Sequence, residues 1–354
     1  MKALVLAGGS GTRLRPFSYS MPKQLIPIAN TSVLEHVLAG IRELGVTEVG
    51  VIVGDLAPQI TDALGDGAAL GLRIEYIRQE RPLGLAHCVR IARPFLADDD
   101  FVMYLGDNML PDGVTEICEE FHARRPVAQV VVHKVSDPSA FGVAELNTDG
   151  SVARVVEKPR QPRSDLALIG VYFFTPAVHR AVDAIEPSAR GELEITDAIQ
   201  WLVHRGATVR ASVYNGYWRD TGRAEDVLDC NRHMLGGLTR RVAGAVDAES
   251  RVLGQVVVED GARVVRSRIE GPAIIGMGAV IEDCVIGPDT SVGRNCVVRG
   301  ATLADSILLD GASIRGVRGV RASVIGRGAS VGTGGPDEDH HRLVVGDHTR
   351  IEVV

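Results

Sequence analysis

Aliphatic residues recur every six positions in the C-terminal part of the chain, and this period restricts the possible folds more than any other feature of the sequence. The repeat is clearest at Ile274, Val280, Ile286, Val292 and Val298. A small or compact residue precedes each of them by two places: Pro272, Gly278, Cys284, Thr290 and Cys296. A six-residue period with inward-facing aliphatic side chains is typical of a parallel β-helix built from hexapeptide repeats. We therefore expect both cysteines of the repeat to be small core residues rather than metal ligands or redox groups.

Before about residue 235 the sequence instead alternates apolar strands with amphipathic helices. The expected strands are 2–7, 48–53, 72–77, 100–105, 127–135 and 168–174, and the expected helices are 32–44, 58–64, 85–92 and 114–124. This alternation predicts a mostly parallel α/β sheet that binds ligands at the carboxyl ends of its strands. Short β-type runs over residues 141–156 predict a hairpin-rich insertion that could wall a substrate pocket. Two domains are thus expected, residues 1–240 and 241–354, with residues 239–249 at the junction.

A glycine-rich turn directly follows the first expected strand. The run Gly8-Gly9-Ser10-Gly11-Thr12-Arg13 lets the backbone turn tightly and present its N–H groups to an anion. Arg13 and Lys23 add positive charge, so the segment suits a polyphosphate. Two better-known phosphate loops do not match, because no Gly-Lys-Ser or Gly-Lys-Thr follows, and the third glycine of G-x-G-x-x-G falls on Leu14.

Two aspartates stand where a metal ion would be held. Asp107 follows the expected strand at 100–105, and Asp220 lies in the turn Tyr217-Trp218-Arg219-Asp220-Thr221-Gly222. Either carboxylate alone also fits a turn or a helix cap. Together with a phosphate loop they supply what Mg²⁺ usually takes from a protein, one or two carboxylates with phosphate oxygens in the remaining positions.

Two further segments carry polar groups at strand ends. Gln79 follows the strand at 72–77, and its amide could pair with the donor and acceptor edge of a pyrimidine, with Gly84 allowing the base to approach. In Glu157-Lys158-Pro159 the glutamate suits sugar hydroxyls and the lysine a second phosphate, although a surface ion-pair turn is the alternative. The proline predicts an extended backbone at Lys158.

Composition excludes several classes of protein. The chain of 354 residues has a net charge of −7, which argues against a general nucleic-acid binder. Its five cysteines form no C-x-x-C pair, so neither a zinc site nor a disulfide framework is indicated, and a reducing cytosol fits. No leader-like segment and no apolar run of membrane-spanning length is found, so a cytoplasmic protein without a membrane partner is expected.

Taken together, these motifs resemble the sugar-1-phosphate nucleotidylyltransferases, and more narrowly the long-form glucose-1-phosphate thymidylyltransferases of deoxysugar pathways. The matching segments are 8–14, 22–25, Gln79 with 82–84, 105–108, 157–159, 191–197 and 218–222. They occur in the family's order over the first 235 or so residues, and the hexapeptide tail matches the long form. The resemblance implies a Rossmann-like, mostly parallel mixed sheet followed by a left-handed parallel β-helix.

The resemblance also implies a reaction and a set of roles. The phosphate of a sugar 1-phosphate would attack the α-phosphorus of dTTP and release pyrophosphate, with Mg²⁺ as the cofactor. The implied catalytic residues are Arg13, Lys23 and Lys158. The implied nucleotide-binding residues are Leu6, Gly8, Gly9, Gly11, Thr12, Arg13, Gln79, Pro82, Gly84 and Asp107. The implied sugar-phosphate residues are Gly142, Glu157, Lys158, Leu168 and Trp218, and the implied metal ligands are Asp107 and Asp220. The roles of Arg190 and of 192–197 stay open, and Thr196 and Asp197 could simply cap a helix over 198–204.

Three alternatives remain at this point. Uridylyl transfer is the nearest, because one methyl group discriminates between bases by only about 1–3 kcal/mol. A second acetyltransferase activity in the β-helix is disfavoured because no histidine lies between His233 and His340. A regulatory relative without activity would be expected to lack Arg13, Lys23 or Asp107, and all three are present. The β-helix would then mediate contacts in a homo-oligomer or support the catalytic domain.

Overall fold

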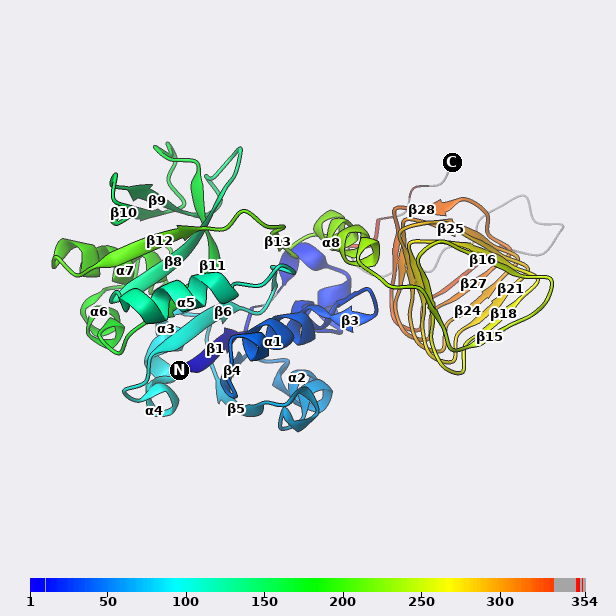
Figure 1. The fold of residues 1–354 in the computed structure, drawn as a ribbon, viewed down its shortest axis with the longest axis horizontal. Helices are drawn as coiled ribbons and strands as arrows, with labels where there is room; N and C mark the ends of the chain where they lie inside the picture. The colour runs from blue at the N-terminus through cyan, green and yellow to red at the C-terminus, as the bar shows by residue number, and fades with distance from the viewer. Residues whose placement is uncertain (10, 334–347, 351, 353–354) are drawn as a thin grey trace. The chain divides into compact units, whose positions relative to one another are not determined.

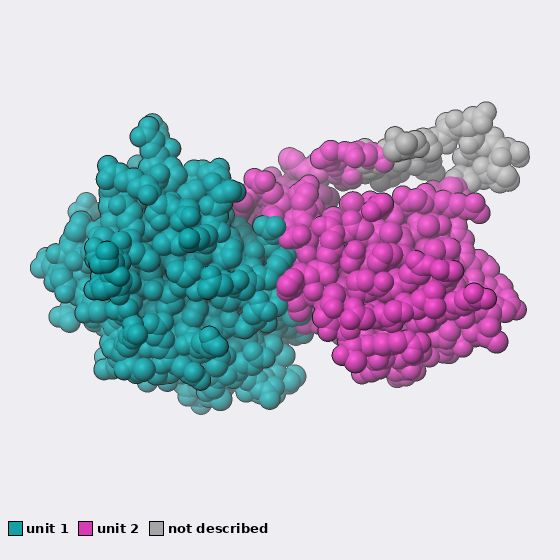
Figure 2. Space-filling model, turned by 45° about the horizontal axis from the view of Figure 1, so that its top comes forward, with its two compact units in different colours: residues 1–10, 21–25, 33–220 teal, residues 11–20, 26–32, 221–354 magenta. Residues whose placement is uncertain are grey.

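The computed structural model describes residues 1–9, 11–333, 348–350 and 352. Ser10, His340 and His341 lie outside the described residues. The chain forms two compact units, coloured separately in Figure 2. Unit 1 comprises Met1–Ser10, Met21–Leu25 and Val33–Asp220, and unit 2 comprises Gly11–Ser20, Ile26–Ser32 and Thr221–Val354. The expected domain boundary after residue 240 stays a prediction.

Unit 1 is built on a mixed nine-stranded sheet flanked by helices (Figure 1). The strands β10-β9-β11-β6-β1-β4-β5 follow one another, and β8 joins β11 to β12. Their bounds are β1 Lys2–Leu6, β4 Glu48–Val53, β5 Arg73–Arg78, β6 Phe101–Leu105, β8 Ala128–Lys134, β9 Gly142–Leu146, β10 Val152–Glu157, β11 Leu166–Phe174 and β12 Val209–Val213. The helices of this unit are α1 Val33–Glu43, α2 Ala57–Leu64, α3 Leu85–Ile91, α4 Arg93–Leu96, α5 Thr115–Arg124, α6 Val178–Ala184 and α7 Ile195–His204. The expected strands and helices are confirmed to within two residues at most ends, and the expected hairpin is the antiparallel pair β9–β10.

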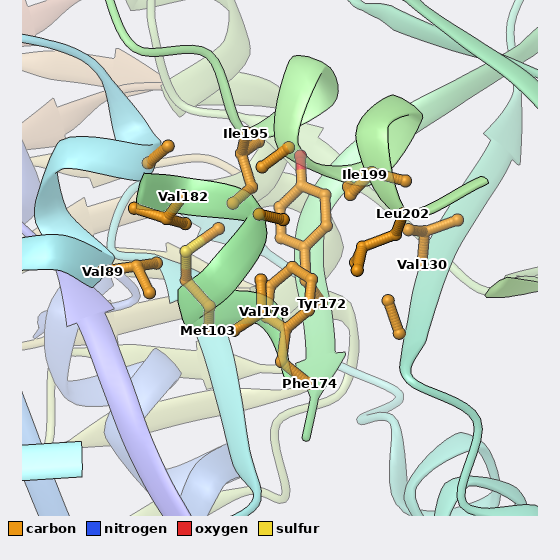
Figure 3. Packing of buried hydrophobic residues seen from close by; sticks show 14 of the residues in the cluster. Val89, Met103, Val130, Tyr172, Phe174, Val178, Val182, Ile195, Ile199 and Leu202 are labelled. Carbon is orange, nitrogen blue, oxygen red and sulfur yellow. The ribbon is translucent and has the colours of Figure 1, made fainter. Parts of the chain in front are cut away.

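The central strand β1 is covered by helices on both faces. Leu4 packs in a cluster with α3, α6 and α7, whereas Ala3 and Val5 pack in a second cluster with α1, α2 and α5. Figure 3 shows the first cluster, where Met103 of β6 and Tyr172 of β11 lie among helical side chains. A strand buried on both faces is apolar along its whole length, which explains why residues 2–7 lack polar alternation. Because β4 and β6 both pair with β1 in parallel, the carboxyl ends of the three strands lie at one edge of the sheet.

Unit 2 contains a parallel β-helix of three sheets, which Figure 1 shows as stacked coils. The first sheet holds β14 Arg241–Val242, β17 Val256–Val258, β20 Ala273–Ile275, β23 Thr290–Val292, β26 Ile307–Leu308 and β29 Val324–Ile325. The second holds β15 Ala245–Val246, β18 Arg263–Val265, β21 Val280–Glu282, β24 Val297–Arg299, β27 Ser313–Arg315 and β30 Ser330–Gly332. The third holds β16 Arg251–Leu253, β19 Arg268–Glu270, β22 Val285–Ile286, β25 Thr302–Ala304 and β28 Val320–Arg321. Within each sheet the neighbouring strands pair in parallel, as the hexapeptide period predicts.

The register of the repeat differs from the strict six-residue period in its first two positions. Ile275 and Ile281 face the core with no exposed surface, and they pair with Val292 and Val298, 17 residues later (292 minus 275). A 17-residue coil contains one side of five residues, so a fixed period of six drifts by one place. The assignments of Ile274 and Val280 as inward residues are therefore wrong, while those of Ile286, Val292 and Val298 are confirmed.

A second hairpin in unit 2 follows the Pro-Lys-Gln-Leu segment. Strands β2 Pro27–Ile28 and β3 Thr31–Ser32 are joined by Ala29 and Asn30, both in the left-handed region. Asn231 of helix α8 (Ala224–Gly236) is fully buried, and its Oδ1 accepts hydrogen bonds from Ala29 N (2.9 Å) and Ser291 Oγ (2.6 Å). One asparagine thus joins this hairpin to strand β23 of the β-helix. No helix among the described residues is long and apolar enough to span a bilayer.

Candidate active site

The glycine turn begins where β1 ends. Gly8 and Gly9 belong to unit 1, and a Cβ on Gly8 would make ordinary contacts with two neighbours, 3.5 Å from Gln79 Oε1 and 3.6 Å from Gly54 N. A Cβ on Gly9 would lie 3.5 Å from Lys23 Cε. The turn therefore passes between Gln79 and Lys23. Leu6, at the end of β1, is buried beneath it.

The following residues of the turn belong to unit 2. Gly11 has φ +61°, and Leu14 N donates to Gly11 O at 2.9 Å, which closes a single 3₁₀ turn over Thr12–Leu14. Only glycine takes this left-handed conformation without strain, so the sequence pattern has a local cause. Thr12 and Arg13 lie within this turn, and Arg13 is exposed.

Lys23 and Asp107 form an ion pair at the carboxyl end of the sheet. Lys23 Nζ contacts Asp107 Oδ2, and the two side chains are only 14% and 13% exposed. Asp107 reaches this position because Gly106 N donates to Leu6 O at 2.9 Å, which extends the pairing of β6 with β1. A Cβ on Gly106 would lie 3.0 Å from Leu6 O, so the close approach favours glycine. The pair places one positive and one negative group beside the glycine turn.

The second aspartate is brought to the first by a short antiparallel pair. In β13 (Arg219–Asp220) and β7 (Asn108–Met109), Asp220 is the register partner of Asn108, the neighbour of Asp107. Trp218 Nε1 donates to Asn108 Oδ1 at 2.8 Å, which fixes the start of this pair. Two carboxylates therefore lie at one sheet edge. Oxygen donors of this kind suit Mg²⁺. Among the described residues, no group of three or more His, Cys, Asp or Glu is arranged to hold a metal ion.

Gln79 lies on the other side of the glycine turn. It is 8% exposed, and its Nε2 lies 3.0 Å from His87 Nδ1 and 3.4 Å from Gly84 O. Gly84 has φ +100°, and a Cβ there would lie 2.4 Å from Leu193 O. Glycine is therefore required at this position by packing against the chain at Leu193, whatever approaches from the ligand side. Pro82 is exposed beside them.

The residues expected around a sugar gather at the β9–β10 hairpin. A Cβ on Gly142 would lie 3.3 Å from Glu157 Oε2 and 3.8 Å from Leu168 Cβ. Thr196 Oγ1 donates to Glu157 Oε2 at 3.1 Å. The ring of Trp218 packs edge-on against Phe141 with centroids 5.4 Å apart, next to Gly142 in the chain. Segments distant in sequence thus meet at Glu157, which also lines a recess on this side of the unit.

Arg190 is the main residue of this recess that the sequence left open. Its guanidinium lies 3.2 Å from Glu157 Oε1, 3.1 Å from Glu192 and 3.4 Å from Glu194 Oε1. Burial raises the pKa of Glu194, and burial together with the Glu157 charge raises the pKa of Asp197. An open groove of about 590 Å³ runs beside these groups, bounded also by Gln200 and His204. An arginine in a loop gives no sign in the sequence that three carboxylates, those of Glu157, Glu192 and Glu194, surround it in the structure.

Two local expectations are corrected here. Lys158 has φ +41°, so it is in the left-handed region and not extended, and Lys158 N donates to Phe141 O at 3.0 Å. This hairpin hydrogen bond overrides the tendency of a residue before proline. Helix α7 begins at Ile195 with Glu194 at its N-cap position, so Thr196 and Asp197 are helical and are not caps. The hydroxyl of Thr196 does not cap the helix and instead donates a hydrogen bond to Glu157.

These elements define a class of protein: an α/β nucleotidyltransferase whose chain continues into a parallel β-helix. The chain belongs to the nucleotidyl transferase family, whose model matches residues 2–236, and residues 269–352 match the GMPPB C-terminal domain. It is 54% identical over 354 residues to glucose-1-phosphate thymidylyltransferase of Streptomyces antibioticus, covering 100% of this chain and 99% of that protein. The protein of the same name from Streptomyces griseus is 51% identical over the same shares. A Bacillus anthracis crystal structure assigned to this activity superposes with a TM-score of 0.61 at 31% identity, covering 65% of this chain and 94% of that one.

Proposed function

We propose that the chain transfers a thymidylyl group from dTTP to glucose 1-phosphate, giving dTDP-glucose and pyrophosphate for deoxysugar biosynthesis. The observation that carries the proposal is the Lys23–Asp107 pair beside the glycine turn, with Asp220 at the neighbouring strand. This arrangement supports the proposal because a glycine turn suited to phosphate, a lysine and two carboxylates suited to Mg²⁺ lie close together. The full-length similarity to proteins named for this activity supports the same substrates.

The chemistry requires positioning and charge neutralisation rather than a covalent intermediate. A sugar-phosphate oxygen is already deprotonated, so no general base is needed to activate it. In this proposal the glycine turn with Thr12 and Arg13 holds the triphosphate, and Lys23 neutralises it. Asp107 and Asp220 would hold Mg²⁺, which supplies a positive charge between the phosphates when bound.

The second substrate is assigned to the recess at the hairpin. Glu157 would accept hydrogen bonds from sugar hydroxyls, with Gly142, Leu168 and Trp218 as walls. Lys158, whose ammonium lies 3.6 Å from Glu157 Oε1, would move to the sugar phosphate. The strained backbone of Lys158 supports a functional role, because such conformations concentrate at binding sites.

A pyrophosphate-release assay tests the proposal. Purified protein is crossed with dTTP, UTP, CTP and GTP and with several sugar 1-phosphates, with and without Mg²⁺. Release with dTTP and glucose 1-phosphate that needs Mg²⁺ supports it, and no release with any pair would refute it. Equal or better rates with UTP would favour the uridylyl alternative.

We further infer that the protein is cytoplasmic and forms a homo-oligomer. The five buried free thiols support a reducing compartment, and the long regular β-helix supports contacts between subunits.

A further inference from the structure

The Gln79 amide is oriented by two acceptors on the same side. Its Nε2 lies 3.4 Å from the carbonyl oxygen of Gly84 and 3.0 Å from Nδ1 of His87. A carbonyl oxygen only accepts hydrogen bonds, so this long contact favours the NH₂ group on its side, and the shorter contact with His87 holds it there. The opposite orientation would place Oε1 against that oxygen. Nδ1 of His87 is therefore an acceptor, which makes the imidazole neutral with its proton on Nε2.

This orientation decides which group Gln79 offers to a ligand. Its Oε1 faces the glycine turn, 3.5 Å from the position that a Cβ on Gly8 would occupy. Both amide hydrogens point to protein acceptors, so the ligand side presents an acceptor alone. The N3–H of thymine or uracil is a donor and matches it. The N3 of cytosine is an acceptor, and in the same pose the two lone pairs would oppose each other.

We propose that His87 is a positioning residue for base selection: its Nδ1 locks the Gln79 amide with Oε1 outward and so favours pyrimidines with an N3–H over cytosine. The inference rests on the proposed function, since it places the base at Gln79. In this proposal His87 does not contact the base itself and acts only by orienting the amide of Gln79. Nothing in the sequence indicated this, since His87 lies in an expected helix without a second ligand at metal spacing.

The surroundings keep His87 neutral at physiological pH. Burial, followed by the positive charges of Arg90 and Arg81, lowers the pKa of His87 below its ordinary value of 6.5. At lower pH the imidazolium carries a proton on Nδ1, which then opposes the NH₂ of Gln79. The amide would rotate by half a turn and present its donors to the base. Acid should therefore reduce the preference for N3–H pyrimidines.

Equilibrium binding tests the inference independently of turnover. Binding of dTTP and dCTP is measured by calorimetry in the presence of Mg²⁺, for the wild type, His87→Leu and His87→Asn. The ratio of the affinities for dTTP and dCTP should fall about tenfold in His87→Leu, because a tenfold change corresponds to the net free energy of one hydrogen bond. His87→Asn should retain most of it, since the asparagine Oδ1 can accept where Nδ1 did. Because the pKa of His87 is lowered below 6.5, the ratio should fall in the wild type as the pH drops from about 6.5 to about 4.5, and it should stay constant in His87→Leu.

An unchanged ratio in His87→Leu, or a wild-type ratio that does not respond to pH, would overturn the inference. The pH series needs no substitution, so it decides even if a variant folds poorly. A wild type that binds nucleotides with this selectivity but releases no pyrophosphate would contradict the proposed function and still support the role of His87. The affinity for glucose 1-phosphate serves as an internal control and should not change in either variant.

Discussion

Lys23 lies in ion-pair contact with Asp107 although 84 residues separate them in the sequence. Both side chains are largely shielded from water, so the interaction is stronger than that of a surface pair. In the proposed reaction each partner has another task, Lys23 at the triphosphate and Asp107 at Mg²⁺. The pair therefore keeps both charges compensated until nucleotide and metal arrive together.

Removing the lysine should separate metal binding from turnover. In Lys23→Met the Asp107 carboxylate loses this cation, so Mg²⁺ alone should bind more tightly. Turnover should nevertheless fall about 10²–10³-fold, because a charge that stabilises the transferring phosphates is lost. Calorimetry with Mg²⁺ alone and the pyrophosphate assay measure the two effects. Weaker Mg²⁺ binding in the variant would contradict the interpretation.

Neutralising the carboxylate should have a different signature. Asp107→Asn keeps the shape of the side chain but halves the carboxylate charge offered to the metal, so the Mg²⁺-dependent rate should fall about 10²–10³-fold. The midpoint of the Mg²⁺ titration should rise at the same time. Asp62→Asn, on the exposed surface of α2, is the matched control and should leave both values unchanged. Full activity of Asp107→Asn would remove the residue from its assigned role.

The sequence predicted the sheet and the order of the motifs because strands buried on both faces and glycine turns leave local patterns. It could not predict contacts that depend on the packing of distant segments, such as the hydrogen bond between Gln79 and His87 or the three carboxylates around Arg190. The prediction that Ile274 faces the core of the β-helix was wrong for a related reason. Side lengths in a 17-residue coil are decided by the pairing of neighbouring coils, which a fixed period does not contain.

Gly84→Ala should destabilise the fold as well as the base site. The residue has φ +100° and a new Cβ would lie 2.4 Å from Leu193 O, so the backbone of one segment must move. The expected loss is about 2–4 kcal/mol in the free energy of unfolding. Gly40→Ala in α1 is the control, because no atom lies within 4 Å of its Cβ position. Urea denaturation should show that the control gains about 0.5–1 kcal/mol.

The corrected register can be tested with two adjacent residues of β22. Ile286 has no exposed surface and Val285 is 43% exposed, so only the first faces the core. Ile286→Ala should cost about 2–5 kcal/mol, whereas Val285→Ala should cost less than about 1 kcal/mol. The same comparison of Ile281→Ala with Val280→Ala distinguishes the observed register from a strict six-residue period. Equal costs at 280 and 281 would contradict the 17-residue coil.

The cysteines should be unreactive in the native protein and should limit its stability in alkali. Burial raises the pKa of Cys88 to about 12 and of Cys118 and Cys296 to about 11, so these thiols stay protonated at pH 8. A thiol-specific reagent should label none of the five buried cysteines before unfolding and all of them afterwards. Because an unfolded thiol ionises near pH 8.5 and the folded ones do not, stability should fall as the pH rises from about 9 towards 11. Cys296→Ala, which removes one such thiol, should reduce that slope; rapid labelling of the native chain would instead show that the β-helix core opens.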